Sequence, residues 1–399
     1  MTTRAEGSAL RRLLAHPLVP LVVGQICLHS CFTGVRMAAP LQALRQGHAT
    51  WAVGLLMGLF ALAPIALALH AGRLADRHGY HKPMRAAVAL SVVGGALAAL
   101  STWVSLAPFA VLCVAALFSG AGANLGLIVI LRTAGRNAHD ATERKRVFSW
   151  LGLAPALANM LGPVLAGSLI DLAGFGAAFG ALALLPLAGL WWARRVPVEM
   201  PTAPDPAQVK SSSWALFRTP GLRPLLLVNW LLSSSWDMHS FVVPILGHER
   251  GFSASAIGLV LGVFAAAVSL VRLAIPLLAH RLRETQVLSG AMLFTACVFA
   301  VYPLVQSAWL MGLCAVLLGL ALGSVQPMIM SMLHQITPHD RHGEAIALRS
   351  MTINFSSATM PLMFGVAGAA LGAASLFWVM GAAVAAGSFQ ARRLGAIRT

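Results

Sequence analysis

Long apolar runs separated by short polar segments dominate this sequence. Each run has the length of a helix that crosses the apolar core of a bilayer, about 20 residues. The runs are continuous rather than alternating, which argues against a β-barrel. The pattern predicts twelve transmembrane helices, at residues 17–43, 51–71, 84–104, 107–131, 147–170, 176–193, 222–246, 255–279, 286–305, 308–332, 348–370 and 373–391. The predicted fold class is therefore an all-α polytopic membrane protein.

The twelve runs form two sets of six that repeat one another. They predict a six-helix bundle over residues 1–193 and another over 222–399, joined by a proline- and serine-rich linker at 194–221. A shift of 204 residues superposes Pro20 on Pro224, Pro40 on Pro244, Gly47 on Gly251, Gly54 on Gly258 and Gly58 on Gly262. Such a repeat predicts two bundles related by a pseudo-two-fold axis, with a substrate site between them near the midplane.

Composition and charge agree with a membrane protein. Hydrophobic residues make up 58% of the chain and charged residues 10%, whereas soluble domains carry about 25% charged residues. If both termini are cytoplasmic, 24 of the 28 lysines and arginines lie in or beside cytoplasmic segments. This bias explains the net charge of +16 without a nucleic-acid partner. We expect a multi-pass protein of the cell (inner) membrane, monomeric, with lipid, protons and a small-molecule substrate as its partners.

One charged segment, Gly72-Arg73-Leu74-Ala75-Asp76-Arg77-His78-Gly79-Tyr80-His81-Lys82, stands between the second and third runs. We interpret it as a tight turn whose glycines allow close helix approach and a sharp reversal. It resembles the signature G-x-L-a-D-r-x-G-r-k of the major facilitator superfamily of secondary transporters, with Tyr80 and His81 where a basic pair is usual. Through the twelve runs and the repeat, the resemblance covers the whole chain. It implies alternating-access transport rather than enzymatic catalysis.

A second motif points to one branch of that superfamily. Gly162-Pro163-Val164-Leu165-Ala166-Gly167 resembles the G-P-x-x-G-G element of twelve-helix drug/proton antiporters, with Ala166 in place of one glycine. In the resembled family, the aspartate at the position of Asp76 contacts the start of the eleventh helix and helps to lock the outward-open state. The alternative for Asp76 is a solvated loop acid that only sets topology. The resemblance implies a conformational gate made of Gly72, Asp76, Arg77, Gly79, Gly162 and Pro163. Arg349, near the start of the eleventh run, either joins the inner gate or extends its charged end to the cytoplasmic surface.

Asp237 is the acidic residue that lies well inside a predicted span. A carboxylate in hydrocarbon is costly, so we expect it to face a cavity or a cation and to exchange protons. The alternative is a fixed ion pair that only holds helices together. Arg36 is the natural partner, because the repeat maps Arg36 onto Ser240 and Asp237 onto Thr33. Arg36 either pairs with Asp237 or binds an anionic group of the substrate.

Polar residues recur at helical spacing in the first and seventh runs, which predicts two stripes facing a cavity or, alternatively, a hydrogen-bonded helix interface. The candidates for proton coupling are Asp237, His239 and His29, although each histidine could instead be a packing residue. Trp236 could stack on a ligand or fill space beside Asp237. The candidates for substrate binding are Arg36, Trp236, Gln25, Thr33, Ser233, Ser240, Asn124, Gln326 and Asn354. For the last three, interhelical hydrogen bonding is the alternative.

The predicted function is proton-coupled efflux, by antiport, of a small, moderately hydrophobic organic molecule. The alternative is proton-coupled import or export of an organic anion bound through Arg36. Motifs of nucleotide binding and of hydrolases (G-x-x-x-x-G-K-[ST], H-E-x-x-H, G-x-S-x-G) do not occur in the sequence, which disfavours an ATP-driven transporter and a membrane enzyme. A non-transporting receptor on the same fold stays open. The five cysteines fall in apolar runs and the histidines are scattered, so neither a metal nor another cofactor is expected.

Overall fold

The computed structural model describes residues 18–137, 141–198, 219–278, 283–337 and 342–396 of the 399-residue chain. Every regular element in these ranges is helical. The first half of the chain forms α2 (Val19–Arg45), α3 (Thr50–His78), α4 (His81–Leu100), α5 (Pro108–Asn137) and α6 (Ala141–Ala193). The second half forms α7 (Leu222–Glu249), α8 (Ala254–Leu278), α9 (Glu284–Val301), the short 3-10 helix η3 (Tyr302–Leu304), α10 (Ala308–Gly323), α11 (Val325–Ile336), α12 (His342–Leu371) and α13 (Ala373–Ala396).

These helices account for the twelve predicted spans. The 53-residue α6 holds two of them, because its backbone leaves helical geometry at Gly174, where φ is 81°. The span predicted at 308–332 is divided between α10 and α11, which meet at Ser324. By length and composition alone, nine ranges of the described helices could cross a membrane, and one of them, Leu151–Ala193, is long enough for two spans. The two long helices outside that set, α7 and α12, carry polar residues in mid-helix.

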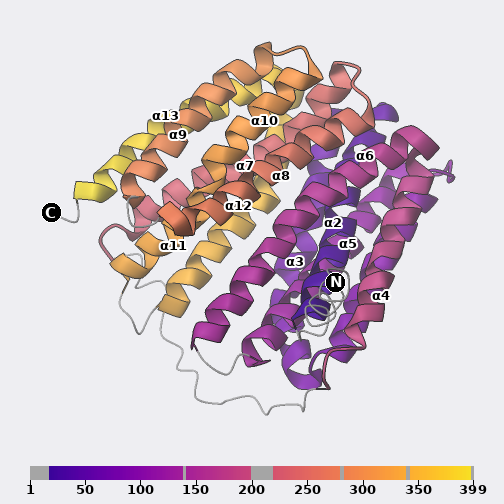
Figure 1. Cartoon of the computed structure of the whole chain (residues 1–399). Helices are drawn as coiled ribbons and strands as arrows, with labels where there is room; N and C mark the ends of the chain where they lie inside the picture. Colours follow the sequence, from indigo (N-terminus) through magenta and orange to yellow (C-terminus); the bar gives the residue numbers. More distant parts are fainter. Residues whose placement is uncertain (1–17, 138–140, 199–218, 279–282, 338–341, 397–399) are drawn as a thin grey trace, which may run out of the picture.

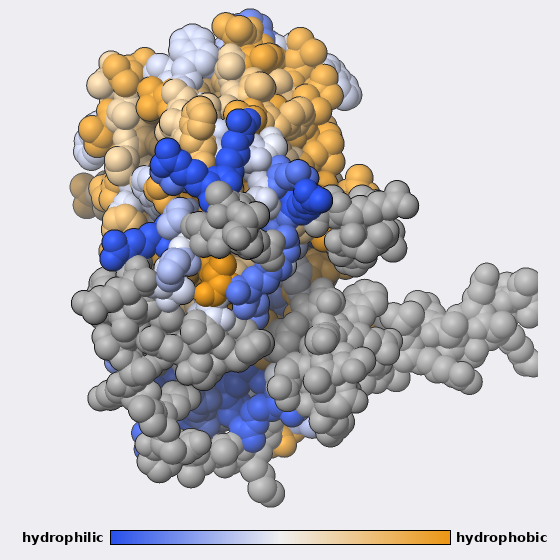
Figure 2. Space-filling view, turned by 90° about the vertical axis from the view of Figure 1, so that its left-hand side faces the viewer, coloured by the Kyte–Doolittle hydropathy of each residue, from blue (hydrophilic) through white to orange (hydrophobic). Residues whose placement is uncertain are grey.

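The two halves of the sequence lie side by side (Figure 1): α2–α6 on one side and α7–α13 on the other. One end of the bundle, here termed the basic end, holds the turn between α3 and α4 and carries Arg73, Arg77, Lys82, Arg85, Arg132, Arg136, Arg194 and Arg195. The other end is termed the opposite end. Figure 2 shows a largely hydrophobic surface in its upper part and hydrophilic residues gathered below it, toward the basic end. An apolar band beside a charged end is the arrangement expected of a protein that spans a bilayer.

The charged segment at Gly72–Lys82 differs from the expected turn. Helix α3 continues through Gly72 and Asp76 to His78, so the chain reverses only at Gly79 and Tyr80. Gly79 has a φ of 67°, which side chains rarely allow, so glycine is needed there. A Cβ at Gly72 would meet nothing within 4 Å. The expectation that Gly72 permits close helix approach is therefore wrong for this conformation.

Glycines bring the two halves into backbone contact toward the opposite end. A Cβ built at Gly54 of α3 would lie 2.5 Å from the carbonyl oxygen of Pro361 and 2.9 Å from the Cα of Gly365, both on α12. A Cβ at Gly258 of α8 would clash with the carbonyl oxygen of Pro163 on α6. Glycine thus leaves room for α3 to pack on α12 and α6 on α8, which closes the bundle toward this end.

Asp171 adds a polar contact to the same closure. Its carboxylate accepts hydrogen bonds from the backbone N–H groups of Ala254 (3.1 Å) and Ser255 (2.7 Å), at the first turn of α8. Partial burial disfavours the charged form, but hydrogen bonds from Ser255 and Ala254 outweigh it, and the pKa of Asp171 lies below its usual value. A carboxylate at a helix N-terminus also interacts favourably with the helix dipole. Asp171 thus fixes α8 to the end of the first span in α6.

Enlarging Gly258 tests the closure. We expect Gly258→Ala to lower stability by about 1–3 kcal/mol, the usual cost of overpacking. Gly290 in α9 is the matched control, since a Cβ there meets nothing within 4 Å. Gly290→Ala should leave stability unchanged or raise it slightly. Thermal unfolding of the purified proteins in detergent measures both, and equal melting temperatures for the two variants would contradict the close packing of α6 on α8.

Candidate functional site

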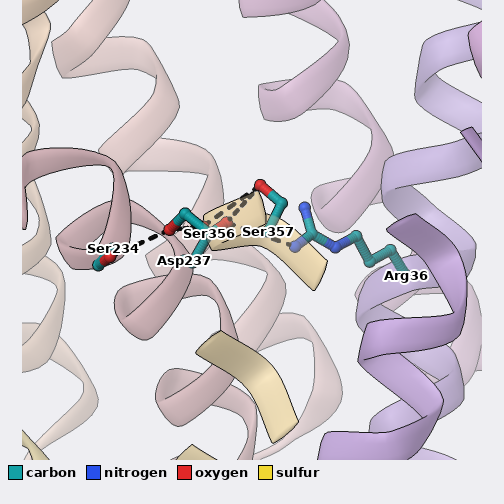
Figure 3. Close-up of polar contacts among 5 residues, drawn as sticks. All are labelled: Arg36, Ser234, Asp237, Ser356 and Ser357. Atoms are coloured by element: carbon teal, nitrogen blue, oxygen red, sulfur yellow. Dashed lines mark hydrogen bonds and ion pairs between the residues drawn. The ribbon is translucent and has the colours of Figure 1, made fainter. Parts of the chain in front are cut away.

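An ion pair joins the two halves in the middle of the bundle. Arg36 of α2 points across to Asp237 of α7, with 3.8 Å between guanidinium Nη2 and carboxylate Oδ1 (Figure 3). The side chain of Asp237 is 5% exposed and that of Arg36 is 21% exposed. The two residues lie at matching depths because each follows the same repeated helix, as the sequence repeat indicates. The structure therefore brings together the predicted cation and the predicted acid.

Serines of α12 donate hydrogen bonds to the carboxylate of Asp237 (Figure 3). The Ser356 hydroxyl donates to Oδ2 at 3.0 Å, and the Ser357 hydroxyl lies 3.2 Å from Oδ1 and 3.3 Å from Oδ2. Ser234 of α7 reaches the Ser356 hydroxyl at 3.0 Å. These donors offset part of the cost of burying a carboxylate and fix its orientation toward Arg36.

A cavity of about 50 Å³ lies beside the ion pair. It is lined from both halves, by Thr33, Arg36, Met37, Met57, Asn159 and Pro163 on one side and by Trp236, Ser240, Leu261, Phe264 and Ala265 on the other. Most of this wall is apolar, and Arg36 is its one charged residue. Of the predicted residues, Arg36, Thr33, Trp236, Ser240 and Pro163 line the cavity, while Asp237 lies behind it.

Of the other predicted residues of the first polar stripe, Gln25 and His29 are not part of the cavity wall. Gln25 is buried, and its side-chain oxygen has no hydrogen-bond partner among the described residues. The His29 ring contacts the Phe32 ring, with centroids 5.5 Å apart. Thr33 lines the cavity but donates its hydroxyl proton to the backbone carbonyl of Ala158 at 2.9 Å. Of these three residues, Thr33 therefore joins α2 to α6.

His239 is separate from the ion pair. It is fully buried, stacks on Phe264 with centroids 4.3 Å apart, and its Nε2 lies 3.2 Å from the Tyr302 hydroxyl. None of these contacts leads to Asp237.

Trp236 packs edge-on against Phe264, with ring centroids 4.7 Å apart, and also forms part of the cavity wall, so both expectations for it are compatible. Ser233 is half-buried, whereas its neighbour Ser234 makes the bond to α12.

The three remaining candidates for substrate binding do not line the central cavity. The side-chain amide of Asn124 donates to the Pro64 carbonyl at 3.5 Å and faces a second cavity, of about 360 Å³, between α3, α4 and α5. Gln326 lies in the first turn of α11, and Asn354 is exposed on α12. Asn124 thus follows the alternative expectation, that of hydrogen bonding between helices.

The predicted gate residues lie at the basic end and in the middle of the bundle. Asp76 pairs with Arg132 of α5, with 2.6 Å between Oδ1 and Nε, so its recorded partner is in its own half. Arg77 is exposed at the rim of the second cavity, and Arg349 is buried in α12. Gly162 packs on α2, where a Cβ would clash with the hydroxyl of Thr33. Among the described side chains, the ion-pair partner of Asp76 is Arg132 rather than a residue at the start of the eleventh span, part of which lies outside the described residues.

Sequence reasoning missed several residues of the site. Ser356 and Ser357 were detectable as adjacent hydroxyls in an apolar run, but nothing in the sequence pairs them with Asp237. Phe264 and Met57 gave no signal, because apolar cavity wall and apolar core have the same composition. Among the described residues no group of three histidine, cysteine or acidic side chains gathers as a metal site. The five cysteines are free thiols.

Comparison with known proteins identifies the fold. A model of the Major Facilitator Superfamily matches residues 21–234 and again 225–394. A search of curated proteins finds no match. A POT family transporter in complex with a thioalcohol-conjugated peptide is similar in structure (TM-score 0.77, 16% identity), covering 93% of this chain and 94% of that one. The nucleoside transporter NupG is also similar (TM-score 0.74, 13% identity), with 96% and 99% covered.

A third solved structure has the same fold. It is a bacterial homologue of the iron transporter ferroportin in an inward-facing state, with a TM-score of 0.70, 16% identity and coverage of 95% and 97%. Peptides, nucleosides and iron differ widely in chemistry. At these identities, the likeness therefore concerns the fold and leaves the substrate to be argued from the site itself.

A double-mutant cycle tests the ion pair. Neutralising one partner, in Arg36→Gln or Asp237→Asn, leaves the other charge unpaired, and breaking a buried pair costs up to about 3–5 kcal/mol. The double variant should lose less than the sum of the single losses, with a coupling energy between about 0.5 and 3 kcal/mol. Chemical unfolding in detergent measures the cycle. Arg36→Gln combined with Asp171→Asn is the control and should be additive, and additivity in both cycles would contradict the pair.

Proposed function

This chain belongs to the Major Facilitator Superfamily, and we propose that it exports a small, moderately hydrophobic organic molecule in exchange for protons. In this proposal residues 1–193 and 222–399 are the two moving halves, joined by the linker at 194–221. The basic end faces the cytoplasm of a cell (inner) membrane, since lysine and arginine gather there. The closed opposite end then makes this the inward-facing state of a monomeric transporter.

The ion pair between Arg36 and Asp237 is the observation that carries the proposal. It crosses from α2 to α7 beside a cavity that both halves line. Its charges depend on one exchangeable proton, because arginine stays charged while a carboxylate can be neutralised. An interaction that exists in one protonation state and not in the other can bias the arrangement of the two halves.

Proton exchange at Asp237 then couples to substrate through Arg36. With Asp237 charged, the pair holds α2 against α7 and keeps the guanidinium directed at Asp237. With Asp237 protonated, the attraction is lost, and Arg36 is free to contact a ligand in the cavity. Protonation and substrate occupancy therefore act on the same contact between the halves. The serines of α12 keep the carboxyl in place during the exchange.

The cavity wall supports a substrate with an apolar body. Met37, Met57, Leu261 and Phe264 offer flexible and aromatic surface, and methionine adapts to ligands of different shape. Trp236 adds a ring face on which a flat molecule can stack. Polar contacts are few, as expected of a site that selects by shape and hydrophobicity more than by hydrogen bonding.

A specific observation favours a second candidate, transport of an organic anion. Arg36 lines the cavity, and its buried Nε has no hydrogen-bond partner among the described residues. A guanidinium forms two parallel hydrogen bonds with a carboxylate or phosphate, and the pair with Asp237 at 3.8 Å leaves that capacity unused. An anionic group could bind here in either direction of transport.

Ligand binding and proton-driven flux test the proposal together. A thermal-shift screen of lipophilic cations, neutral amphiphiles and aromatic carboxylates finds the substrate class, because a ligand that binds the folded state raises the melting temperature. We expect Asp237→Asn proteoliposomes to lose uphill transport of the best ligand under an imposed pH gradient while still exchanging it at equilibrium. Glu249→Gln, at an exposed carboxylate, is the control and should transport normally. Undiminished uphill transport by Asp237→Asn would overturn the coupling role.

Asp76 is proposed as a conformational latch that exchanges partners between states. In the inward-facing state it pairs with Arg132, and in the outward-facing state it contacts the start of α12. Asp76→Asn removes the charge from both contacts, but the Asp76 side chain is 65% exposed in its pair with Arg132, where an ion pair contributes little. The variant should therefore lose more in the outward-facing contact and favour the inward-facing state. The measurement is labelling of Ser240→Cys, in a background without native cysteines, by an impermeant maleimide added outside. Slower labelling is expected for Asp76→Asn than for Asp76→Glu, and equal rates would rule out the latch.

A further inference from the structure

Two arginines in the second half of the chain, one buried and one half-buried, have no partner that the transport proposal explains. They are Arg272 of α8 and Arg349 of α12, and Arg349 is 8% exposed. The Nε atoms of both are buried without a hydrogen-bond partner among the described residues. The two ion pairs found among the described residues, Arg36 with Asp237 and Arg132 with Asp76, include neither arginine.

Both arginines lie on helix faces that lead to the central site. Arg272 follows the cavity-lining Ala265 by seven residues, and Arg349 precedes Ser356, which holds Asp237, by seven. Seven residues are two helical turns, about 10 Å, so each side chain lies on the same face as its reference residue. Both displacements run toward the basic end. Arg272 and Arg349 therefore lie at a similar depth, about two helical turns from the central site toward the basic end.

The surroundings of Arg272 argue against a position facing lipid. Its neighbours Leu270 and Leu273 are 63% and 60% exposed, so the outward surface of α8 at this level is apolar. Arg272 itself is only half-buried overall, but its Nε is fully enclosed. The guanidinium thus lies on the side of α8 that the bundle covers.

The two guanidinium groups also act on each other. Because they lie at a similar depth on helix faces that lead to the same site, the charge of Arg272 repels that of Arg349. Burying one cation without a partner is costly, and placing a second beside it adds repulsion. Such a pair is stable when an anion lies between the two groups, because each guanidinium can then form charge-assisted hydrogen bonds with it.

We propose that Arg272 and Arg349 form an anion-binding subsite, distinct from the central cavity, for a carboxylate, sulfate or phosphate group. Its ligand enters from the basic end and meets these two arginines before it reaches Arg36. The subsite deepens the proposed function, because it assigns an acidic group to the transported molecule and so favours the second substrate candidate. Only that assignment rests on the proposed function, since anion binding itself needs no transport. A lipid phosphate has the same chemistry and is the other source of the anion.

Binding of inorganic sulfate and phosphate tests the subsite without a transport assay. We expect either anion, replacing chloride at constant ionic strength, to raise the melting temperature of the purified full chain in detergent. Arg272→Gln and Arg349→Gln should each weaken this effect about 10- to 100-fold in anion concentration, the loss of charge-assisted hydrogen bonds. Arg223→Gln, an exposed arginine of the same half, is the matched control and should respond like the wild type.

A second readout separates binding from a structural role. Without multivalent anions, Arg272→Gln and Arg349→Gln should melt at or above the wild-type temperature, because the repulsion is removed. A structural role predicts lower melting temperatures instead. If a glutamine variant does not fold, Arg272→Lys and Arg349→Lys keep the charge without the planar fork and should show a reduced anion response.

A parallel melting experiment in nanodiscs identifies the source of the anion. The same proteins are melted in nanodiscs of phosphatidylcholine with or without phosphatidylglycerol. Stabilisation by phosphatidylglycerol alone, lost in Arg272→Gln and Arg349→Gln, assigns the subsite to a lipid phosphate, whereas a response to sulfate assigns it to soluble anions. An equal response of all variants to every anion, or no response of the wild type, would overturn the subsite. A transporter that fails proton coupling but keeps this response would overturn only the proposed function.

Discussion

Burying a charge inside this bundle costs solvation energy, and the ion pair between Arg36 and Asp237 offsets that cost for two charges at once. The pair crosses from α2 to α7 at 3.8 Å, and the serines of α12 take up the remaining lone pairs of the carboxylate. The same contact therefore stabilises two charges and links the two halves of the chain. In the proposed mechanism, protonation of Asp237 removes this contact, and a proton gradient can thereby act on the relative position of the halves.

Contacts on the two sides of this ion pair differ. Toward the opposite end, Gly54 and Gly258 allow the halves to touch through their backbones, and Asp171 anchors the first turn of α8. Toward the basic end, the recorded partner of Asp76 is Arg132 of the same half. The apolar cavity wall and the arginines along the same faces are compatible with one kind of solute, which has a hydrophobic body and an acidic group.

The sequence predicted most of the fold because membrane spans leave a strong pattern. Twelve apolar runs and the in-register prolines and glycines were sufficient for the helices and the repeat, and Asp237 and Arg36 stood out because charges in such runs are rare. The break at Ser324 was missed, although Pro327 in the first turn of α11 is a sequence signal for a helix start. Which serines bond to Asp237, and which arginine pairs with Asp76, depends on which helices are in contact. Helical periodicity alone does not determine those contacts. His239 differs from the sequence-based expectation in another way. Its position two residues after Asp237 suggested that the two side chains exchange protons, yet the His239 ring contacts Tyr302 and Phe264.

Infrared difference spectroscopy of the reconstituted protein tests the central claim most directly, because it observes the proton on the carboxyl group itself. Spectra recorded at two pH values, with and without bound ligand, are compared with those of Asp237→Asn. The account predicts a protonated-carboxyl C=O band in the wild type that grows on acidification, changes with ligand binding and is missing from the variant. Identical spectra in that region for the two proteins would contradict proton exchange at Asp237.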